Sequence, residues 1–309
     1  MKNISPFHEG EIAVQTQAGV EEKAKMIGHV ILDRIRDDAI PFIAQQSMAV
    51  LGSCDDKGNL WSSIIFGEPG FIVAEDVHTV CLNKQKSYTA LTDPLWQNIE
   101  NNPQIGMLLI DLASRKRLRI NGQLLLKKEH AYYFGVNQCY GNCPKYIQSR
   151  QIVDINRAVH NIQSSRQVGQ HLNHELQHWI SHADTFFVAS AHPSQGVDVS
   201  HRGGPPGFVK VLNSKRLRIP DFIGNNMFNT LGNFISNPHA GLAFLDFEHG
   251  VVLQLTGTPT VFWNESDKKD ESAGTSRYWE FEIVQWRKIE MPVTISWQYL
   301  GASPFLPNI

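Results

Sequence analysis

A glycine and two asparagines, Gly224-Asn225-Asn226, lie where the chain is best suited to bind a charged ligand. A β-rich run at residues 216–220 precedes them, and a short helical pattern follows them. At such a strand-to-helix junction, glycine lets the backbone approach a ligand, the asparagines donate hydrogen bonds, and the helix N-terminus favours an anion. This chemistry suits a phosphate or a ribityl chain. An asparagine-rich turn with a helix N-cap accounts for the same residues, so both interpretations stay open at this point.

A second candidate is the segment HELQH at residues 174–178, which fits the zinc-protease pattern H-E-x-x-H. In such enzymes the two histidines lie one helical turn apart, and the glutamate is the general base. No third-ligand motif follows His174 and His178, and the segment leads directly into a β-rich run. The polar face of a helix is the simpler interpretation, so a zinc hydrolase is the weaker functional alternative.

Other patterns carry less weight. Cys139 and Cys143 have no second cysteine pair or nearby histidine that would complete a zinc site. Ser200 and His201 are adjacent, but the G-x-S-x-G elbow of serine hydrolases is absent. The sequence also lacks a P-loop and a Rossmann glycine fingerprint, so we expect no internal NAD(P)H site.

The elements that must position these residues occur twice in the chain. The stretches "NNPQIGMLLID" at 101–111 and "SNPHAGLAFLD" at 236–246 share Asn-Pro, a glycine and an aspartate at an offset of 135, and Gly122 and Gly257 keep this offset. Further upstream the offset is 137, where Ile43, Ser53, Ser63, Gly67, Pro69, Gly70 and Phe71 match Ile180, Ser190, Ser200, Gly204, Pro206, Gly207 and Phe208. A register held over about eighty residues indicates a tandem duplication.

Each copy has the same predicted plan. A helix (21–35 or 167–180) precedes short β-rich runs, a short helical segment ends at Asn-Pro, and two more strands follow. The strands are expected at 47–54, 61–67, 70–75, 79–83, 105–112 and 118–126, and at 185–191, 207–213, 216–220, 240–247 and 251–262. Short strands with turn signals between them predict small antiparallel barrels.

We predict a first domain at 1–150, a barrel with its N-terminal helix. The second, at 151–309, would contain a connecting helix, the second barrel and a C-terminal tail. The connection, at 147–178, is expected to be polar and helical. The tail from residue 279 onward has no expected equivalent in the first copy.

The segments 219–245, 200–208 ("SHRGGPPGF") and 141–148 ("GNCPKYIQ") resemble the FMN-binding split-barrel family related to pyridoxamine 5′-phosphate oxidase. The similarity extends over about 40–150 and 177–265, and "PDFIGNN" is its most specific part. The resemblance implies a mainly β fold with flanking helices, in which two split barrels pair and hold FMN in the clefts between them. Here the two copies would form an intrachain pseudo-dimer.

The resemblance also implies which residues contact FMN. The flavin ring would lie near Ser200, His201 and Arg202, with the strand of Phe208, Val209 and Lys210 beneath it. Ile219, Pro220 and Asp221 would border the ring or the ribityl chain. The phosphate would lie near Gly224, Asn225 and Asn226. The family's C-terminal Arg-x-His substrate element has no match, so oxidation of vitamin B6 is not expected.

The family often has Arg-Lys where this chain has Asn225-Asn226, so positive charge must come from elsewhere. Only the first copy has Arg117, Arg119 and Lys145. An unpaired phosphate in a cleft is costly, so we expect these cations to complete the cradle across the seam between the barrels. This predicts one good FMN site and one degenerate site. Solvated strand charges are the alternative for the two arginines.

Composition narrows the functional class. The 309 residues are 42% hydrophobic and 19% charged, as in globular proteins, and the net charge of −2 gives no general attraction to nucleic acid or an anionic membrane. No apolar run is long enough to span a membrane. Four scattered cysteines suggest reduced thiols and a cytoplasmic location.

The expected function is an FMN-dependent oxidoreductase that transfers electrons or hydride between FMN and a small molecule or oxygen. His201 and Arg202 are the catalytic candidates, and His201 could move protons because its ordinary pKa is close to neutrality. A separate NAD(P)H-dependent reductase is a candidate electron donor, and pairing of two pseudo-dimers into a homodimer is left open. A non-catalytic flavin-binding or storage protein is the main alternative.

Overall fold

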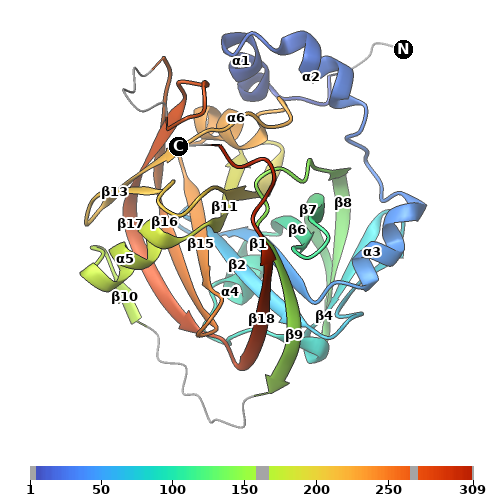
Figure 1. The fold of residues 1–309 in the computed structure, drawn as a ribbon. Helices are drawn as coiled ribbons and strands as arrows, with labels where there is room; N and C mark the ends of the chain where they lie inside the picture. The colour runs from blue at the N-terminus through green and yellow to red at the C-terminus, as the bar shows by residue number, and fades with distance from the viewer. Residues whose placement is uncertain (1–4, 158–166, 265–270, 308–309) are drawn as a thin grey trace.

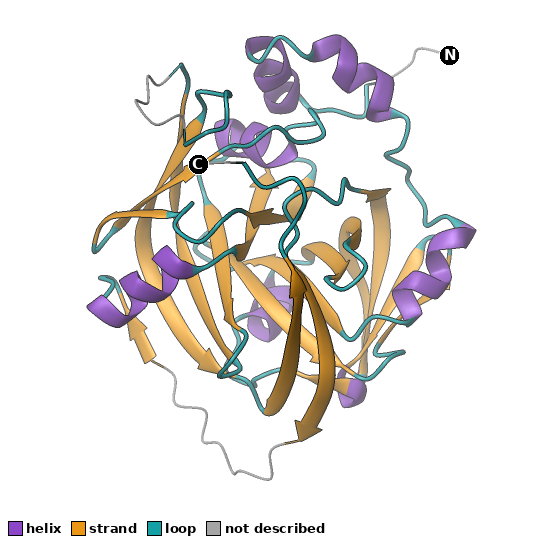
Figure 2. Cartoon of the chain, viewed as in Figure 1, coloured by secondary structure: helices purple, strands orange, loops and turns teal. Residues whose placement is uncertain are grey.

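A computed structural model describes residues 5–157, 167–264 and 271–307. The described chain is mainly β, with short helices around the strands and one helix behind them near the centre of the view (Figure 2). The first sheet contains β1 (Met48–Cys54), β2 (Leu60–Gly67), β3 (Ile72–Asp76), β4 (Thr79–Asn83), β5 (Ser87–Tyr88), β6 (Gln104–Asp111), β7 (Lys116–Lys128) and β8 (Ala131–Gly141). The second contains β10 (Gln167–Gly169), β11 (Thr185–His192), β12 (Gly196–Gly203), β13 (Lys210–Asn213), β14 (Arg216–Pro220), β15 (Ala240–Asp246), β16 (Val251–Phe262) and β17 (Tyr278–Glu290).

The two sheets have the same strand order. The first runs β3-β4-β8-β7-β6-β1-β2-β5, and the second, followed from its β13 edge, runs β13-β14-β17-β16-β15-β11-β12. All neighbouring strands pair antiparallel. The split-barrel fold is therefore confirmed. The shared strand order fits the predicted duplication, and the internal offsets of the sequence identify equivalent strands.

Each barrel has its own apolar core, and a third apolar cluster joins the barrels. That cluster combines outward-facing residues of the first barrel, such as Val50 and Leu108, with Phe187 and Ala243 of the second. In Figure 1 the blue-to-green first barrel and the yellow-to-red second barrel lie side by side. The two copies thus form the expected intrachain pseudo-dimer.

The glycine shared by the two repeated stretches lies at this junction. A Cβ atom on Gly106 would come within 2.8 Å of the Asp198 backbone, and one on Gly241 within 2.6 Å of the Leu60 carbonyl oxygen. Real Cβ atoms do not approach this closely, so the close contact between the barrels needs glycine at both positions. The repeated stretch therefore forms the interface between the copies.

A third, two-stranded sheet pairs β9 (Ser149–Arg157) with β18 (Val293–Gly301). The two strands lie side by side at the front of Figure 1. Within the two large sheets, β17 occupies the position of β8, and β18 follows β17 as β9 follows β8. The expectation that residues from 279 onward lack a first-copy equivalent is therefore wrong. The strands match in position although their sequences have diverged too far to align by eye.

The helices are α1 (Glu9–Gln17), α2 (Glu21–Gly28), α3 (Ile40–Ala44), α4 (Leu95–Asn101), α5 (His174–His182) and α6 (Asn229–Ser236). The predicted helix at 21–35 is wrong beyond Gly28, because Leu32 exchanges backbone hydrogen bonds with Cys139 of β8 instead. The helix predicted at 167–180 begins only at His174, where the side chain of Asn173 caps it.

The connection expected to be helical at 147–178 contains β9, β10 and the start of α5, and its residues 158–166 lie outside the described part. The strands expected from the sequence do not include β5, β8, β9, β10, β12, β17 and β18. Among the described residues, no helix has the length and apolar character needed to cross a membrane.

Candidate functional site

A pocket opens at the seam between the two barrels, and we call it the seam pocket. The first barrel contributes β7 and the loop after β8, through Arg117, Arg119, Asn142, Cys143, Lys145 and Tyr146. The second barrel contributes Ser200, His201, Arg202, Gly203, Phe208, Pro220, Asp221, Phe222, Gly224, Asn225, Asn226, Phe228, Asn229, Thr230 and Leu231. The structure therefore brings cations of one copy to the glycine-asparagine segment of the other.

Three residues predicted to contact FMN do not line this pocket. Val209 and Ile219 are fully buried in the core of the second barrel. Lys210 is exposed and forms an ion pair with Glu271 at 3.1 Å. The other predicted site residues all line the pocket.

The segment from Asn225 to the start of α6 forms a cradle. Asn226 and Phe228 have positive φ angles of 63° and 61°, and the Asn225 side chain accepts a hydrogen bond from the Met227 backbone N–H at 3.1 Å. Phe228 is the N-cap of α6, and no side chain caps the first turn. The asparagines therefore shape the turn but do not cap the helix, and the helix N-terminus can receive an anion.

Arg119 is a buried part of the seam pocket and is paired with residues of both barrels. Its side chain is 5% exposed, and its Nε lies 3.3 Å from Asp198 Oδ1. Its Nη1 donates hydrogen bonds to Tyr140 at 2.9 Å and to the Asn229 side chain at 3.0 Å. Arg119 thus connects both barrels to the first residue of α6, and the alternative of a solvated strand charge is wrong for it.

Arg117 has no carboxylate within ion-pair distance among the described residues. Its Nη2 donates to the Cys143 carbonyl oxygen, and its Nη1 lies 3.4 Å from His201 Nδ1. Burial, followed by the nearby charge of Arg119, lowers the pKa of Arg117 to about 9. A partly desolvated cation without a counter-charge is costly, so a bound anion would stabilise it.

Arg202 is fixed at the other side of the pocket. Its Nη1 donates to Asp221 Oδ1 at 2.9 Å, and Arg277 donates to Asp221 Oδ2 at 3.1 Å. Asp221 is 4% exposed. The carboxylate is thus shared by two cations, and it holds Arg202 rather than facing a ligand as a free charge.

His201 is buried beside these cations. Burial is the main cause that keeps its pKa well below the ordinary value of 6.5, and the charges of Arg117 and Arg202 add to it. The ring is therefore neutral near pH 7, and the expectation that His201 could move protons by titrating there is wrong. Because the guanidinium of Arg117 can only donate, Nδ1 must accept, which assigns the ring proton to Nε2.

Several buried donors of the seam pocket have no hydrogen-bond partner among the described residues. They are Arg117 Nε, Arg119 Nε, Asn142 Nδ2, His201 Nε2 and Arg202 Nε. Buried polar groups are normally paired, so a cluster of unsatisfied donors indicates a ligand rich in acceptors. The phosphate and ring carbonyl groups of FMN fit this donor set.

Part of the lining of the seam pocket is not apparent from the sequence. Tyr146 packs against Phe222 with ring centroids 5.2 Å apart, and its hydroxyl donates to the Ile223 carbonyl oxygen at 3.0 Å. Ser303 of the C-terminal segment accepts a hydrogen bond from the Tyr146 N–H at 3.1 Å. The C-terminal segment thus fastens the loop after β8, a role that only the folded chain makes visible.

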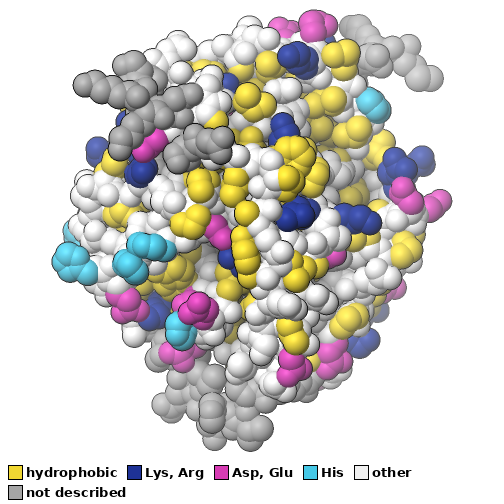
Figure 3. Space-filling model, in the orientation of Figure 1, with side chains coloured by type: hydrophobic (Ala, Val, Ile, Leu, Met, Phe, Trp, Pro, Cys, Tyr) yellow, Lys and Arg dark blue, Asp and Glu magenta, His cyan; other side chains and the backbone are white. Residues whose placement is uncertain are grey.

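The HELQH segment lies elsewhere, on α5. Figure 3 shows histidine side chains gathered over α5 at one edge of the visible face. His178 packs against His182, with ring centroids 4.0 Å apart, and Glu175 pairs with Lys288 at 2.8 Å. Within the described ranges, neither His174 nor His178 belongs to a group of three side chains that could hold a metal.

The position that the internal repeat makes equivalent to the seam pocket is closed. Gln254 replaces Arg119, Val252 replaces Arg117, and Ser63 matches Ser200. Ser63 donates to Asp93 Oδ1 at 2.6 Å, and Gln254 Nε2 lies 3.1 Å from Ser63 Oγ and 2.9 Å from Asp93 Oδ2. We call Ser63, Asp93 and Gln254 the closed cluster. All three are buried, and the donors of Ser63 and Gln254 are paired within the cluster, whereas the seam pocket leaves donors unpaired.

Comparison with known proteins adds a family match. Residues 172–293 match the family model described as pyridoxamine 5′-phosphate oxidase. No curated protein matches the chain.

Three solved structures are similar to part of this chain. A putative pyridoxamine 5′-phosphate oxidase from Lactobacillus delbrueckii is 14% identical, with 38% of this chain and 94% of that chain covered and a TM-score of 0.31. HupZ from Group A Streptococcus is 14% identical, with 43% and 98% covered and a TM-score of 0.29. The heme storage protein HutZ from Vibrio cholerae is 12% identical, with 40% and 94% covered and a TM-score of 0.26. These scores are too low to support an inference about activity.

The family match includes α5, all the strands of the second barrel from β11 to β17 and its side of the seam pocket. The recognition of the pyridoxamine 5′-phosphate oxidase family from the sequence is therefore confirmed over residues 172–293 of this chain.

Proposed function

We propose that the seam pocket binds one FMN per chain and that the protein is an FMN-dependent oxidoreductase acting on a small molecule or oxygen. The observation that carries this proposal is the set of unpaired buried donors around Arg117, which has no carboxylate partner among the described residues. The family match at residues 172–293 supports the same conclusion.

The phosphate would be held by Arg117, Lys145 and the uncapped first turn of α6, which combine positive charge with free backbone N–H groups. Bound FMN would supply the redox chemistry. His201 would contribute a neutral Nε2–H donor, and Arg202, oriented by Asp221, a fixed positive charge. Donors that are oriented before the reaction stabilise developing negative charge without reorganisation.

The same residues would also build a non-catalytic flavin-binding or storage protein. The two functions differ in whether the bound flavin can be reduced and reoxidised. A separate NAD(P)H-dependent reductase as electron donor, a cytoplasmic location and pairing of two chains stay predictions.

Titration of the purified protein with FMN, followed by flavin fluorescence quenching, tests the binding site. We expect saturation at one FMN per chain. Two sites of equal affinity would contradict the single-site proposal, and no binding would contradict FMN as the ligand.

Anaerobic reduction then separates enzyme from carrier. The loaded protein is mixed with NAD(P)H, alone and with a flavin reductase, and then with oxygen or a panel of small acceptors. Bleaching and recovery of the flavin absorbance support the oxidoreductase. A bound flavin that no reductant can reduce would contradict the oxidoreductase and favour the non-catalytic flavin-binding or storage function.

A further inference from the structure

Helix α1 packs on the second barrel, although it precedes the first barrel in the sequence. Figure 1 shows it lying over α6. A Cβ atom on Gly10 would lie 2.4 Å from the Gly232 carbonyl oxygen, and one on Gly232 would lie 2.6 Å from the Glu11 backbone. The two helices therefore meet backbone to backbone, which only glycine at the crossing allows.

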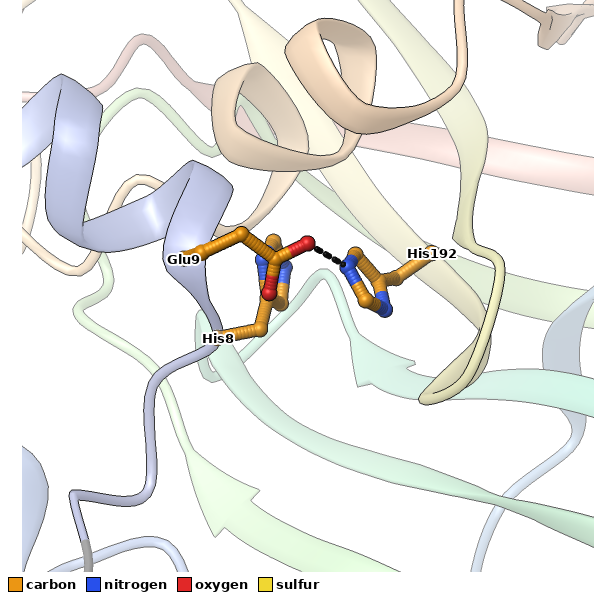
Figure 4. Close-up of side chains that lie close together, drawn as sticks. All are labelled: His8, Glu9 and His192. Atoms are coloured by element: carbon orange, nitrogen blue, oxygen red, sulfur yellow. Dashed lines mark hydrogen bonds and ion pairs between the residues drawn. The ribbon is translucent and has the colours of Figure 1, made fainter.

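Two polar contacts fasten the start of α1. His8 Nε2 lies 2.9 Å from Asn233 Oδ1 of α6, and His192 Nε2 of β11 lies 2.7 Å from Glu9 Oε1. Figure 4 shows the three side chains His8, Glu9 and His192 together, with the Glu9–His192 contact drawn as a dashed line.

His8, Glu9 and His192 are close enough to suggest a metal site, but their geometry opposes it. The two imidazole rings stack with centroids 4.1 Å apart and an angle of 26° between their planes, so their in-plane lone pairs do not converge on one point. His192 Nδ1 also lies 3.2 Å from the Ser194 backbone N–H, which places the ring proton on Nε2 facing Glu9. The cluster is better explained as a set of contacts that hold α1 against the second barrel.

Two further contacts run from α1 to the cradle itself. Gln15 Nε2 donates to the Met227 carbonyl oxygen at 2.9 Å, and the Glu11 carboxylate accepts a hydrogen bond from the Asn229 side chain. Gln15 is 1% exposed and Glu11 is 4% exposed. A buried carboxylate and a buried amide are costly unless they are paired, so these contacts define one position of the cradle.

Asn229 is held from both sides. Its side-chain nitrogen donates to Glu11 of α1, while its oxygen accepts from Arg119 of the first barrel. Asn229 is also the first residue of α6 and lines the seam pocket. Asn229 therefore links α1 directly to the seam pocket.

We propose that Glu11 and Gln15 are positioning residues of the seam pocket. In this arrangement α1 supports Met227 and Asn229 from behind, so that docking of α1 and binding of a ligand in the pocket favour each other. Such coupling is reciprocal, because each event must stabilise the other by the same free energy. The inference rests on the proposed function only for the choice of FMN as the ligand.

Hydrogen exchange of the full chain, read by mass spectrometry at pH 7 with and without FMN, tests this coupling. In Gln15→Ala and Glu11→Ala we expect amides at 225–231 to exchange about tenfold faster, and FMN to bind about tenfold more weakly, as the loss of one buried hydrogen bond predicts. Glu11→Gln keeps an acceptor for Asn229 and should restore both values to near the wild type. Gln17→Ala is the matched control, because Gln17 is exposed on the same helix.

In the wild type, FMN should in turn slow exchange in α1. The proposal is overturned if Gln15→Ala and Glu11→Ala speed exchange only within 9–17 and leave both the 225–231 amides and the FMN affinity unchanged. If the wild type binds no FMN, the proposed function fails, but the exchange of 225–231 without ligand still decides whether α1 positions the cradle.

Discussion

The seam pocket and the closed cluster occupy equivalent positions in the two copies, yet one is open and basic and the other is sealed. Arg119 and Gln254 lie at matching positions of β7 and β16, two residues after Arg117 and Val252. In the seam pocket these positions carry two guanidinium groups, and one of them has no counter-charge among the described residues. At the equivalent positions of the second copy, the amide of Gln254 and the aliphatic side chain of Val252 replace them.

The difference shows how a duplicated fold can keep one site and lose another without a change in topology. In the closed cluster the carboxylate of Asp93 is paired internally, since it accepts from both Ser63 and Gln254. The seam pocket keeps its polar groups available, at a cost in stability that a ligand would offset. Substituting residues of the seam pocket with those at the equivalent positions of the other copy therefore tests directly whether these residues cause the difference between the two sites.

The largest effect is expected for Arg119→Gln, which places the residue of the closed cluster in the seam pocket. Asp198 would lose its buried ion-pair partner, and breaking such a pair costs about 3–5 kcal/mol. Urea unfolding should show this loss, together with the loss of FMN binding. The double variant Arg119→Gln, Asp198→Asn should recover most of the stability but not the binding. A loss of less than about 1 kcal/mol in the single variant would mean that the pair is not structurally important.

The next effect concerns the pH dependence of the closed cluster. Burial raises the pKa of Asp93 from 3.8 to about 6. The folded state thus holds the Asp93 proton more tightly than the unfolded state does. The resulting contribution of Asp93 to the free energy of unfolding is fully present below pH 3.8 and is lost as the pH rises through 6. The loss amounts to about 3 kcal/mol.

Asp93→Asn should remove this dependence. Gln254 Oε1 has no partner among the described side chains. If the Gln254 amide flips, this oxygen can accept a hydrogen bond from the introduced asparagine amide. Unfolding free energies at pH 4 and pH 7.5 would measure the difference, with the exposed residue Asp56 changed to Asn as the control. Parallel pH curves for wild type and Asp93→Asn would show that Asp93 is not responsible.

Arg117→Val copies Val252 into the seam pocket and should weaken FMN binding about 100-fold, as expected for the loss of charge-assisted hydrogen bonds to a phosphate. The unfolding free energy should not fall, because the variant removes a cation that has no carboxylate partner among the described residues. Fluorescence titration measures the affinity, and Lys116→Ala, on the exposed neighbour in β7, is the control. An unchanged affinity would show that the phosphate binds elsewhere.

The smallest effect is expected for Lys145→Ala. Lys145 lies in the loop after β8. The equivalent connection in the second barrel, between β17 and β18, is shorter and has no residue that matches Lys145. A flexible, partly exposed cation should contribute about threefold to tenfold in FMN affinity, and less at high salt. Titrations at low and high ionic strength, compared with Lys57→Ala, would measure this. A salt-independent change would argue against a role through charge.

The repeat made most of the fold predictable. Strands such as β1, β6 and β16 follow from their apolar patterns, and the duplication follows from the shared offsets. Strands β8 and β17 did not follow, because their partly exposed faces interrupt the apolar pattern and their sequences have diverged. The helix expected at 21–35 failed because hydrogen bonding of Leu32 to β8 is a tertiary contact.

For the candidate site, the sequence indicated the cradle and the cations of the opposite copy, since each copy contains what the other lacks. It did not reveal Tyr146, Ser303 or helix α1, because their approach to the pocket depends on contacts between segments far apart in the chain. It also suggested that His201 titrates near neutrality, whereas burial beside arginines keeps the ring neutral.

The sequence by itself determined the duplicated barrel plan and the presence of a glycine-asparagine cradle, because local patterns and internal repeats are written in consecutive residues. Only the tertiary structure decided that Arg117 is half-buried without a carboxylate partner among the described residues, while Asp93 is paired with Gln254. Burial and pairing depend on which distant side chains meet. For this reason one seam position is an open basic pocket and its equivalent is closed.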